Sequence, residues 1–328
     1  MTNNKASFLN ITNIIRERPL DINIEVVNGC PLKCVFCRNQ FSDRDYSVMK
    51  MDLFQKIVTE YIEIGGGALG LSSMLSDVFM DSLLMERLRF LKSFKDSLYI
   101  YTTNPLVSLS RYDDLTLKEI LDTFDLIQVS VDGYNRDDYL IMTGVDGFDV
   151  FWKMIYRCKE MIERHDYNTH ISLYFRTSSI EKLEETDTYK ELSKVFYVKE
   201  KRDSYFDWFG AIKPECLPEP ARIIYRDNSK CTMDCAAAMS TLAVRVDGLV
   251  SGCGCVDWEG EYIVGDCNNN SILEIWNSDE AIRFRNCFSE KNIPSICKKC
   301  GLYCPISSAY SKTSLQKYKP IDGLYYEI

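Results

Sequence analysis

Three cysteines that lie within eight residues constrain this chain more than any other feature of its sequence. Cys30, Cys34 and Cys37 are separated by three and then two residues, and they follow an apolar run at 22–27. We expect these cysteines to lie in a loop that wraps a compact object. Gly29 and Pro31 allow the chain to turn sharply out of the preceding segment. We therefore expect this loop to hold a metal centre.

A cubane iron–sulfur cluster fits such a ligand set, because three thiolates leave one iron without a protein ligand. An open iron can bind a further ligand, as catalytic metal sites do with their vacant position. Phe36, just before the third cysteine, can cover the cluster or a bound adenine. Zinc is the alternative. A structural zinc site has four protein ligands and no open position. The two histidines, His165 and His170, lie far along the chain, although a distant cysteine could complete the site.

Composition narrows the class of protein. The chain has 328 residues and a formal net charge of -9, which disfavours a nucleic-acid partner. The first residues lack the pattern of a signal peptide, and no segment is apolar for the length of a bilayer. We therefore expect a cytoplasmic protein with no membrane partner. In a reducing compartment, 14 cysteines favour cluster or metal ligation, whereas a disulfide framework would require export.

The first two thirds of the chain alternate between short apolar runs and longer helical patterns, which is typical of parallel βα units in an open sheet or a barrel. The expected strands are 22–27, 69–73, 98–103, 126–131, 170–175 and 205–211. The expected helices are 47–63, 79–94, 115–123, 148–163, 184–195 and, nearer the C-terminus, 272–286.

A second, cysteine-rich module is expected after this pattern ends near Pro214. Ten of the 14 cysteines lie between Cys216 and Cys304. We place the boundary so that residues 1–210 form the first domain and residues 211–328 the second. Within the second, Cys235 and Cys253 flank a hairpin that turns at Gly248, and Cys297 and Cys300 form a later pair. Four thiolates from two turns can bind zinc or an iron–sulfur cluster.

The segment IEVVNGCPLKCVFC at 24–37 resembles the signature loop of the radical S-adenosylmethionine (SAM) superfamily. The resemblance implies a partial (β/α)6 TIM-like barrel, a [4Fe-4S] cluster on the three cysteines, and SAM bound at the open iron. It also implies that cofactor contacts come from the ends of the strands, where barrel active sites assemble. On the matching positions these contacts are Phe36, Asp77, Thr103, Ser130 and Arg176. Asp77 departs from the usual Gly-Gly-Glu motif of the family.

The C-terminal module resembles the SPASM/twitch extension of the same superfamily. The resemblance rests on CX12GX4C, on IVGDCNNNSILEIWNSDEAIRFR and on the closing CX2C. It implies an auxiliary [4Fe-4S] cluster held by Cys235, Cys253, Cys297 and Cys300. Full SPASM modules have seven cysteines, and no cysteine follows Cys304 here, so we expect one auxiliary cluster, with two as the alternative.

The resemblance also implies the chemistry. A 5′-deoxyadenosyl radical would take a hydrogen atom from the substrate, with a flavodoxin- or ferredoxin-type protein as reductant. Oxidation of the substrate radical by the auxiliary cluster would give dehydrogenation, whereas hydrogen return from a thiol would give epimerisation. Cys255 and Cys304 are the candidate donors, with Cys267 as a further possibility.

Two classes of substrate compete, namely a small polyol, sugar or aminocyclitol, and a peptide. Many peptide-modifying relatives carry an N-terminal peptide-binding domain, and only 29 residues precede Cys30, which favours a small molecule. A non-enzymatic iron–sulfur carrier or zinc module is a third reading. A carrier needs no open iron inside a barrel, so this reading is the weakest of the three.

Overall fold

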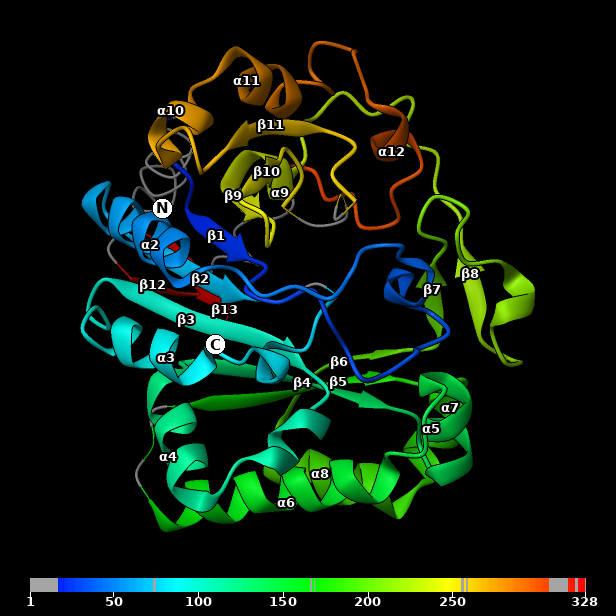
Figure 1. The fold of residues 1–328 in the computed structure, drawn as a ribbon. Helices are drawn as coiled ribbons and strands as arrows, with labels where there is room; N and C mark the ends of the chain where they lie inside the picture. Colours follow the sequence, from blue (N-terminus) through cyan, green and yellow to red (C-terminus); the bar gives the residue numbers. More distant parts are fainter. Residues whose placement is uncertain are drawn as a thin grey trace, which may run out of the picture.

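One continuous sheet organises the molecule. The computed structural model describes residues 17–306, except 73, 74, 166, 168, 255, 256 and 258, together with the backbone of 318–321 and 324–327. Its first six strands are all parallel and neighbour one another in chain order, which confirms the expected α/β partial barrel (Figure 1). They are β1 (Asp21–Ile24), β2 (Gly67–Leu71), β3 (Leu98–Asn104), β4 (Leu126–Asp132), β5 (His170–Arg176) and β6 (Tyr197–Arg202).

Helices cover the outer face of these strands, as Figure 1 shows. They are α2 (Met51–Glu63), α3 (Leu84–Lys92), α4 (Asp114–Thr123), α5 (Arg136–Thr143), α6 (Phe148–Arg164), α7 (Ile180–Glu185) and α8 (Asp187–Val195). The main hydrophobic core lies between helices and sheet, and it includes Phe54 and Ile57 of α2 and Ile22 and Ile24 of β1. Burial of this kind contributes about 25 cal/mol per Å² of apolar surface, which holds the layers together.

The other face of the strands is polar. Along β1, Ile22 and Ile24 are fully buried, whereas Asp21 and Asn23 alternate with them and face the inside of the barrel. The Tyr101 hydroxyl on β3 donates to the Asp21 carboxylate over a distance of 3.0 Å, reaching across β2. Gly70 of β2 leaves room for this contact, because a Cβ there would lie 2.0 Å from Asn23 Oδ1. The barrel interior is therefore lined by groups suited to polar ligands.

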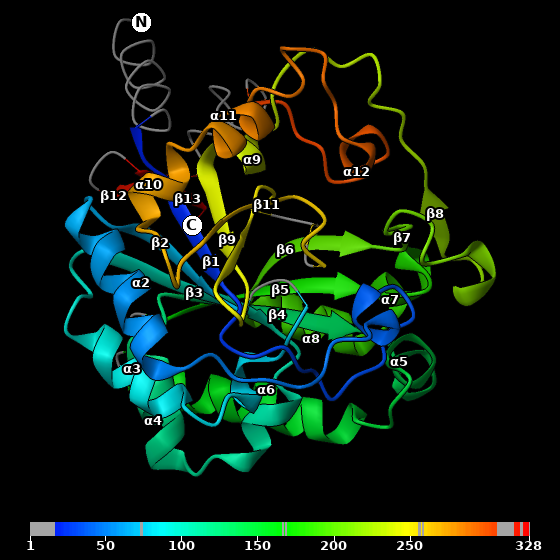
Figure 2. The same cartoon turned by 45° about the horizontal axis from the view of Figure 1, so that its top comes forward.

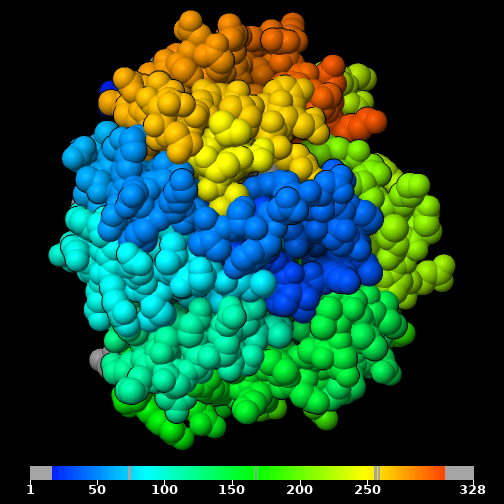
Figure 3. Space-filling model, in the orientation of Figure 1, coloured from blue at the N-terminus to red at the C-terminus, as the bar shows by residue number. Residues whose placement is uncertain are grey.

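The C-terminal part extends the same sheet. Strand β9 (Thr241–Val244) pairs in parallel with β1, and β10 (Leu249–Ser251) and β11 (Ile263–Asp266) continue it as antiparallel neighbours. The β9–β10 turn passes through Gly248 at a φ of 91°, which favours glycine. Figure 2 shows this hairpin rising beside β1, and in Figure 3 its yellow surface lies directly against the blue segment that follows β1. The two cysteine-bearing parts are thus neighbours in space.

Four short helices and two small two-stranded sheets are described in and beside the C-terminal part. The helices are α9 (Ala236–Ser240), α10 (Ile272–Trp276), α11 (Asp279–Arg285) and α12 (Ser295–Lys298). Strand β7 (Ser204–Phe206) pairs in parallel with β8 (Arg222–Ile224), and β12 (Tyr318–Ile321) pairs antiparallel with β13 (Leu324–Glu327). The boundary that we place after residue 210 stays a proposal.

Three expectations about elements are wrong. The sixth strand of the sheet is β6, not 205–211, since only Ser204–Phe206 is extended there and its partner is β8. Four of the six residues of β6 are charged, so the strand does not form the apolar run by which the other strands are predicted. The expected helix at 272–286 is two helices, because Ser278 accepts a hydrogen bond from Ala281 N and caps a new helix, α11.

The expected helix at 184–195 is also interrupted. Thr186 ends α7 and caps α8, with its side chain accepting a hydrogen bond from Tyr189 N. The other expected helices are present with shifted ends, whereas α5 (Arg136–Thr143) was not expected. Among the described residues, no helix is both long and apolar enough to cross a membrane.

Candidate active site

Backbone hydrogen bonds fix the path of the cysteine loop. Lys33 N and Val35 N donate to Thr143 O and Met142 O at the end of α5, over 2.8 and 2.9 Å. Within the loop, Cys37 N donates to Cys34 O over 2.9 Å, so the last two cysteines share one tight turn. The thiols of Cys30, Cys34 and Cys37 are free and half-buried. The loop is therefore anchored to the barrel at its centre.

Charged side chains from separate strand ends face these thiols. Burial is the largest influence and raises the pKa of all three, that of Cys37 to about 11. Asp77 adds to the rise at Cys30, and Asp132 adds to it at Cys34, whereas Arg176 opposes it at Cys37. Asp77 follows β2, Asp132 ends β4 and Arg176 ends β5. The strand ends thus converge on the loop, as in other barrel active sites.

Asp77 is held beside the loop by its backbone and by one of its carboxylate oxygens. Its backbone N–H donates to Gly29 O over 2.8 Å, next to the first cysteine. Its Oδ1 accepts hydrogen bonds from Asn104 Nδ2 and Phe79 N, at 2.6 and 3.0 Å. Its Oδ2 is buried and makes no hydrogen bond of standard geometry within the described structure. Burial raises the pKa of this carboxyl, although the nearby Ser108 hydroxyl opposes the rise. A buried oxygen in this state suits a donor from a bound ligand.

Arg176 joins two other residues that the sequence singles out. Its Nη1 donates to Ser130 Oγ over 2.6 Å and lies 3.9 Å from Asp132 Oδ1. Its guanidinium lies 5.6 Å from the centre of the Phe36 ring. Phe36 is also stacked on Tyr205, with ring centres 4.8 Å apart. Phe36, Ser130 and Arg176 therefore form one group next to the third cysteine.

Thr103 stands apart from that group. Its hydroxyl donates to Gln128 Oε1 over 3.0 Å, in the middle of β4. None of the contacts found for it in the described structure reaches the cysteine loop. Its predicted role in binding the cofactor stays a prediction.

Sequence reasoning missed Asp132, Tyr205 and Trp208. Trp208 Nε1 donates to Phe36 O over 3.0 Å, and Asp132 lies close enough to all three thiols to raise their pKa values. Burial also raises the pKa of Asp132, to about 6. Asp132 could have been found as the last residue of an apolar strand. Nothing in the sequence indicates that Trp208 reaches a residue 172 positions away.

The four predicted auxiliary ligands gather in the C-terminal part. The pKa of Cys300 is raised mainly by burial and further by Cys253 and Cys235, and that of Cys297 is raised in part by Cys253 and Cys300. Asn228, a residue that we did not single out, fixes the CX2C turn. Its side-chain amide donates to Cys297 O and Cys300 O, each over 2.9 Å.

Further cysteines border this group. Cys287 is the largest cause of the raised pKa at Cys297, and it is buried. Cys304 is half-buried and close to Cys235 and Arg226. Cys267 is fully buried in the core. Cys255, the other candidate hydrogen donor, lies outside the described residues.

The thiols of the cysteine loop match the ligand set of a cluster. In a cubane, each thiolate binds a different iron, so its ligands are spread around the cluster. The loop supplies three free thiols in a half-buried setting, and the buried Asp77 carboxylate lies beside them. Among the described residues, no group of three His, Cys, Asp or Glu side chains is placed to hold a single metal ion. The residues present therefore fit an iron–sulfur cluster with a further ligand.

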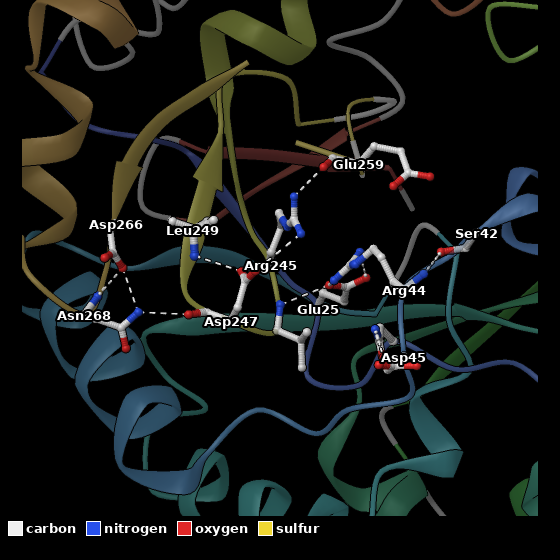
Figure 4. A network of polar contacts seen from close by, with 12 residues as sticks. Glu25, Ser42, Arg44, Asp45, Arg245, Asp247, Leu249, Glu259, Asp266 and Asn268 are labelled. Carbon is white, nitrogen blue, oxygen red and sulfur yellow. Dashed lines mark hydrogen bonds and ion pairs between the residues drawn. The ribbon is translucent and has the colours of Figure 1, made fainter. Parts of the chain in front are cut away.

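A polar network links the cysteine loop to the C-terminal part (Figure 4). Glu25, which follows β1, binds Arg44 through both carboxylate oxygens at 2.6 and 3.0 Å. The same carboxylate accepts a hydrogen bond of 3.0 Å from Val246 N at the end of β9. Arg38, one residue past the third cysteine, pairs with Glu259 at 3.4 Å. The two cysteine-bearing parts are therefore held in a defined arrangement.

The fold and these two groups of thiols define a class of iron–sulfur enzyme built on a parallel barrel. The family model of the radical SAM superfamily matches residues 24–189, and the model of the SPASM iron–sulfur cluster-binding domain matches residues 235–301. The chain belongs to the radical SAM superfamily and carries a C-terminal SPASM domain. Its cofactors are accordingly the superfamily's [4Fe-4S] cluster and SAM, with iron–sulfur binding in the SPASM domain.

Solved structures share the fold at low identity. BtrN in complex with AdoMet and 2-DOIA is 13% identical, with a TM-score of 0.58 over 86% of this chain and 93% of that one. The anSMEcpe structure with bound AdoMet is 16% identical, with a TM-score of 0.55 over 86% of each chain. Streptococcus suis SuiB bound to precursor peptide SuiA is 12% identical, with a TM-score of 0.57 over 84% of this chain and 69% of that one. No curated protein sequence matches this chain.

Proposed function

We propose that this protein dehydrogenates or epimerises a small polyol, sugar or aminocyclitol by radical chemistry, and that it receives electrons from a flavodoxin- or ferredoxin-type protein. The observation that carries the radical step is the convergence of Asp77, Asp132 and Arg176 on the thiols of the cysteine loop. In this superfamily the reduced cluster and SAM together supply a 5′-deoxyadenosyl radical.

The residues of this chain have distinct parts in that proposal. Cys30, Cys34 and Cys37 hold the first cluster, and Cys235, Cys253, Cys297 and Cys300 hold one auxiliary cluster. The buried Asp77 carboxylate accepts a hydrogen bond from the amino group of SAM through Oδ2, because Oδ1 is already occupied. Arg176 and Ser130 bind the carboxylate end of SAM, since a guanidinium matches a carboxylate in geometry and charge. Phe36 flanks the adenine.

The position of a cavity supports a small substrate. A partly enclosed cavity of about 50 Å³ lies between the ends of β1 and β2 and the β9–β10 hairpin. Cys253, a proposed auxiliary ligand, forms part of its wall, and Ser76, next to Asp77, forms another part. The likeness to BtrN, solved with 2-DOIA, is consistent with a small substrate.

Modification of a peptide, by cross-linking, epimerisation or sulfatase-type maturation, is the second candidate. It is favoured by the likeness to SuiB bound to precursor peptide SuiA and to anSMEcpe with the Cp18Cys peptide.

Dehydrogenation is the better supported of the two reactions on a small molecule. Epimerisation requires a thiol that can return a hydrogen atom to the substrate. Of the two candidate donors, Cys304 lies beside Cys235 and, among the described residues, is not one that lines the cavity. Cys267 is enclosed in the core.

Mass spectrometry of product formed in D2O tests the reaction class. A reconstituted, reduced enzyme should convert a neutral cyclitol or sugar to a ketone two mass units lighter, with one 5′-deoxyadenosine per product. An epimer of unchanged composition that carries one solvent deuterium would instead indicate hydrogen return from a thiol. Turnover of peptides alone would overturn the small-molecule proposal.

A further inference from the structure

The cavity beside the β9–β10 hairpin contains two buried polar atoms that have no hydrogen-bond partner among the described residues. They belong to Ser72, just after β2, and to Arg245, just after β9. Both residues line the cavity, on the wall formed by the barrel and on the wall formed by the C-terminal part, respectively. Buried polar atoms are almost always hydrogen-bonded in folded proteins, so two such atoms at one cavity indicate a missing ligand.

Ser72 combines an unpartnered hydroxyl with an unusual backbone. The residue is 4% exposed, and its Oγ makes no hydrogen bond. Its φ is 47°, in the left-handed region that side-chain-bearing residues avoid. Its backbone N–H donates to Ile24 O over 2.8 Å, which ties the turn after β2 to the C-terminal end of β1. Backbone strain of this kind is concentrated at ligand sites.

Arg245 has one donor left over after its other contacts are made. Its Nη1 donates to Glu259 O, and its Nη2 lies 3.3 Å from Asp247 Oδ2. Its Nε is buried without a partner. Figure 4 shows the side chain fixed between these two contacts. The guanidinium is therefore held in place, with one N–H available to an acceptor.

The carboxylates that line the cavity already accept hydrogen bonds from protein groups. Glu25 binds Arg44 and Val246 N, as described above. Asp257 accepts hydrogen bonds from Ser251 Oγ at 2.7 Å and from two backbone N–H groups at 2.8 and 2.9 Å. These carboxylates have little capacity left, and their charge disfavours a strongly anionic ligand. What the cavity offers is a hydroxyl and one charged N–H donor.

We infer that this cavity is the substrate site, and that Ser72 Oγ and Arg245 Nε bind the hydroxyl oxygens of a neutral polyol and not those of a phosphate ester. This inference rests on the proposed function and narrows its substrate class. A hydroxyl accepts from Arg245 and can both donate to and accept from Ser72, so it satisfies both atoms at once. Ser76, next to Asp77, and Cys253, a proposed auxiliary ligand, both line the site.

Calorimetric titration tests this without any turnover. Reconstituted protein with SAM and no reductant is titrated with myo-inositol, with D-glucose and with myo-inositol 1-phosphate. The wild type should bind at least one neutral polyol and should bind the phosphate ester more weakly. Ser72→Ala should bind that polyol roughly two- to tenfold more weakly, which corresponds to one lost hydrogen bond. Arg245→Lys should show a loss of similar size.

Ser172→Ala is the matched control, because Ser172 is also a buried serine whose hydroxyl has no partner, and it does not line this cavity. It should bind the polyol as the wild type does. Neither alanine variant removes a hydrogen bond from the free protein, so both should keep the wild-type melting temperature. Binding of neither neutral polyol, tighter binding of the phosphate ester, or equal binding by Ser72→Ala and wild type would each overturn the inference. Formation of 5′-deoxyadenosine from SAM and reductant, measured without substrate, tests the radical chemistry of the proposed function separately from the binding of a polyol.

Discussion

The indole nitrogen of Trp208 lies 3.0 Å from the backbone oxygen of Phe36 and donates a hydrogen bond to it. The accepting carbonyl belongs to the peptide group whose N–H is that of Cys37. On its other side, Trp208 contacts Phe206, with ring centres 5.6 Å apart, and Phe206 packs with Cys300. One residue therefore contacts both cysteine-bearing parts. Trp208 and Phe209 adopt φ angles of 46° and 60°, which cost on the order of 1 kcal/mol each.

Replacing Trp208 by Phe should loosen the cysteine loop. The variant keeps an aromatic ring and loses only the N–H donor, so we expect amide hydrogen exchange in residues 34–41 to become roughly two- to tenfold faster. Trp152→Phe is the control, because the Trp152 nitrogen on α6 makes no hydrogen bond. Equal protection of the loop in both variants would show that Trp208 does not position it.

Replacing Asp77 by Asn should weaken SAM binding by roughly ten- to a hundredfold, the range expected when a hydrogen bond to a charged group is lost. The shape of the side chain and its contacts through Oδ1 are kept, so the fold should survive. Equilibrium dialysis of reconstituted protein with labelled SAM measures the effect. Asp125→Asn is the control, since Asp125 is also a largely buried carboxyl with a raised pKa, and its contact is with Ile100 N on β3. Unchanged affinity in Asp77→Asn would remove this residue from the SAM site.

Asp21 should make stability depend on pH. Burial raises its pKa from 3.8 to about 7, although Tyr101 and Thr241 oppose the rise. The folded state thus holds this proton more tightly than the unfolded state does. The resulting stability is fully present below pH 3.8 and is lost as pH rises through about 7.

Asp21→Asn should therefore gain stability relative to the wild type, by up to roughly 4 kcal/mol at pH 8 and by less at pH 5. Urea unfolding at both pH values measures the difference. A constant difference between the two proteins across this range would show that Asp21 does not hold a proton in the fold.

The sequence predicts those parts of the site that depend on spacing. The three cysteines of the first loop and the Cys297–Cys300 pair need only a turn, so their residue numbers alone indicate a metal centre. The contact of Trp208 with Phe36 could not be foreseen, because it depends on a left-handed turn formed by bulky residues. The charged strand β6 escaped the apolar pattern, since it lies at the edge of the sheet. Nothing in the spacing indicated that β9 would pair with β1.

Iron and sulfide analysis of wild type beside the Cys30/Cys34/Cys37→Ala triple variant tests the central claim most directly. The account predicts that the variant loses about four irons per chain and all formation of 5′-deoxyadenosine from SAM and dithionite, and that it keeps the iron of the auxiliary site. An unchanged iron content, or continued formation of 5′-deoxyadenosine by the variant, would contradict the assignment of these cysteines. Loss of all iron from the variant would contradict a separate auxiliary cluster on Cys235, Cys253, Cys297 and Cys300.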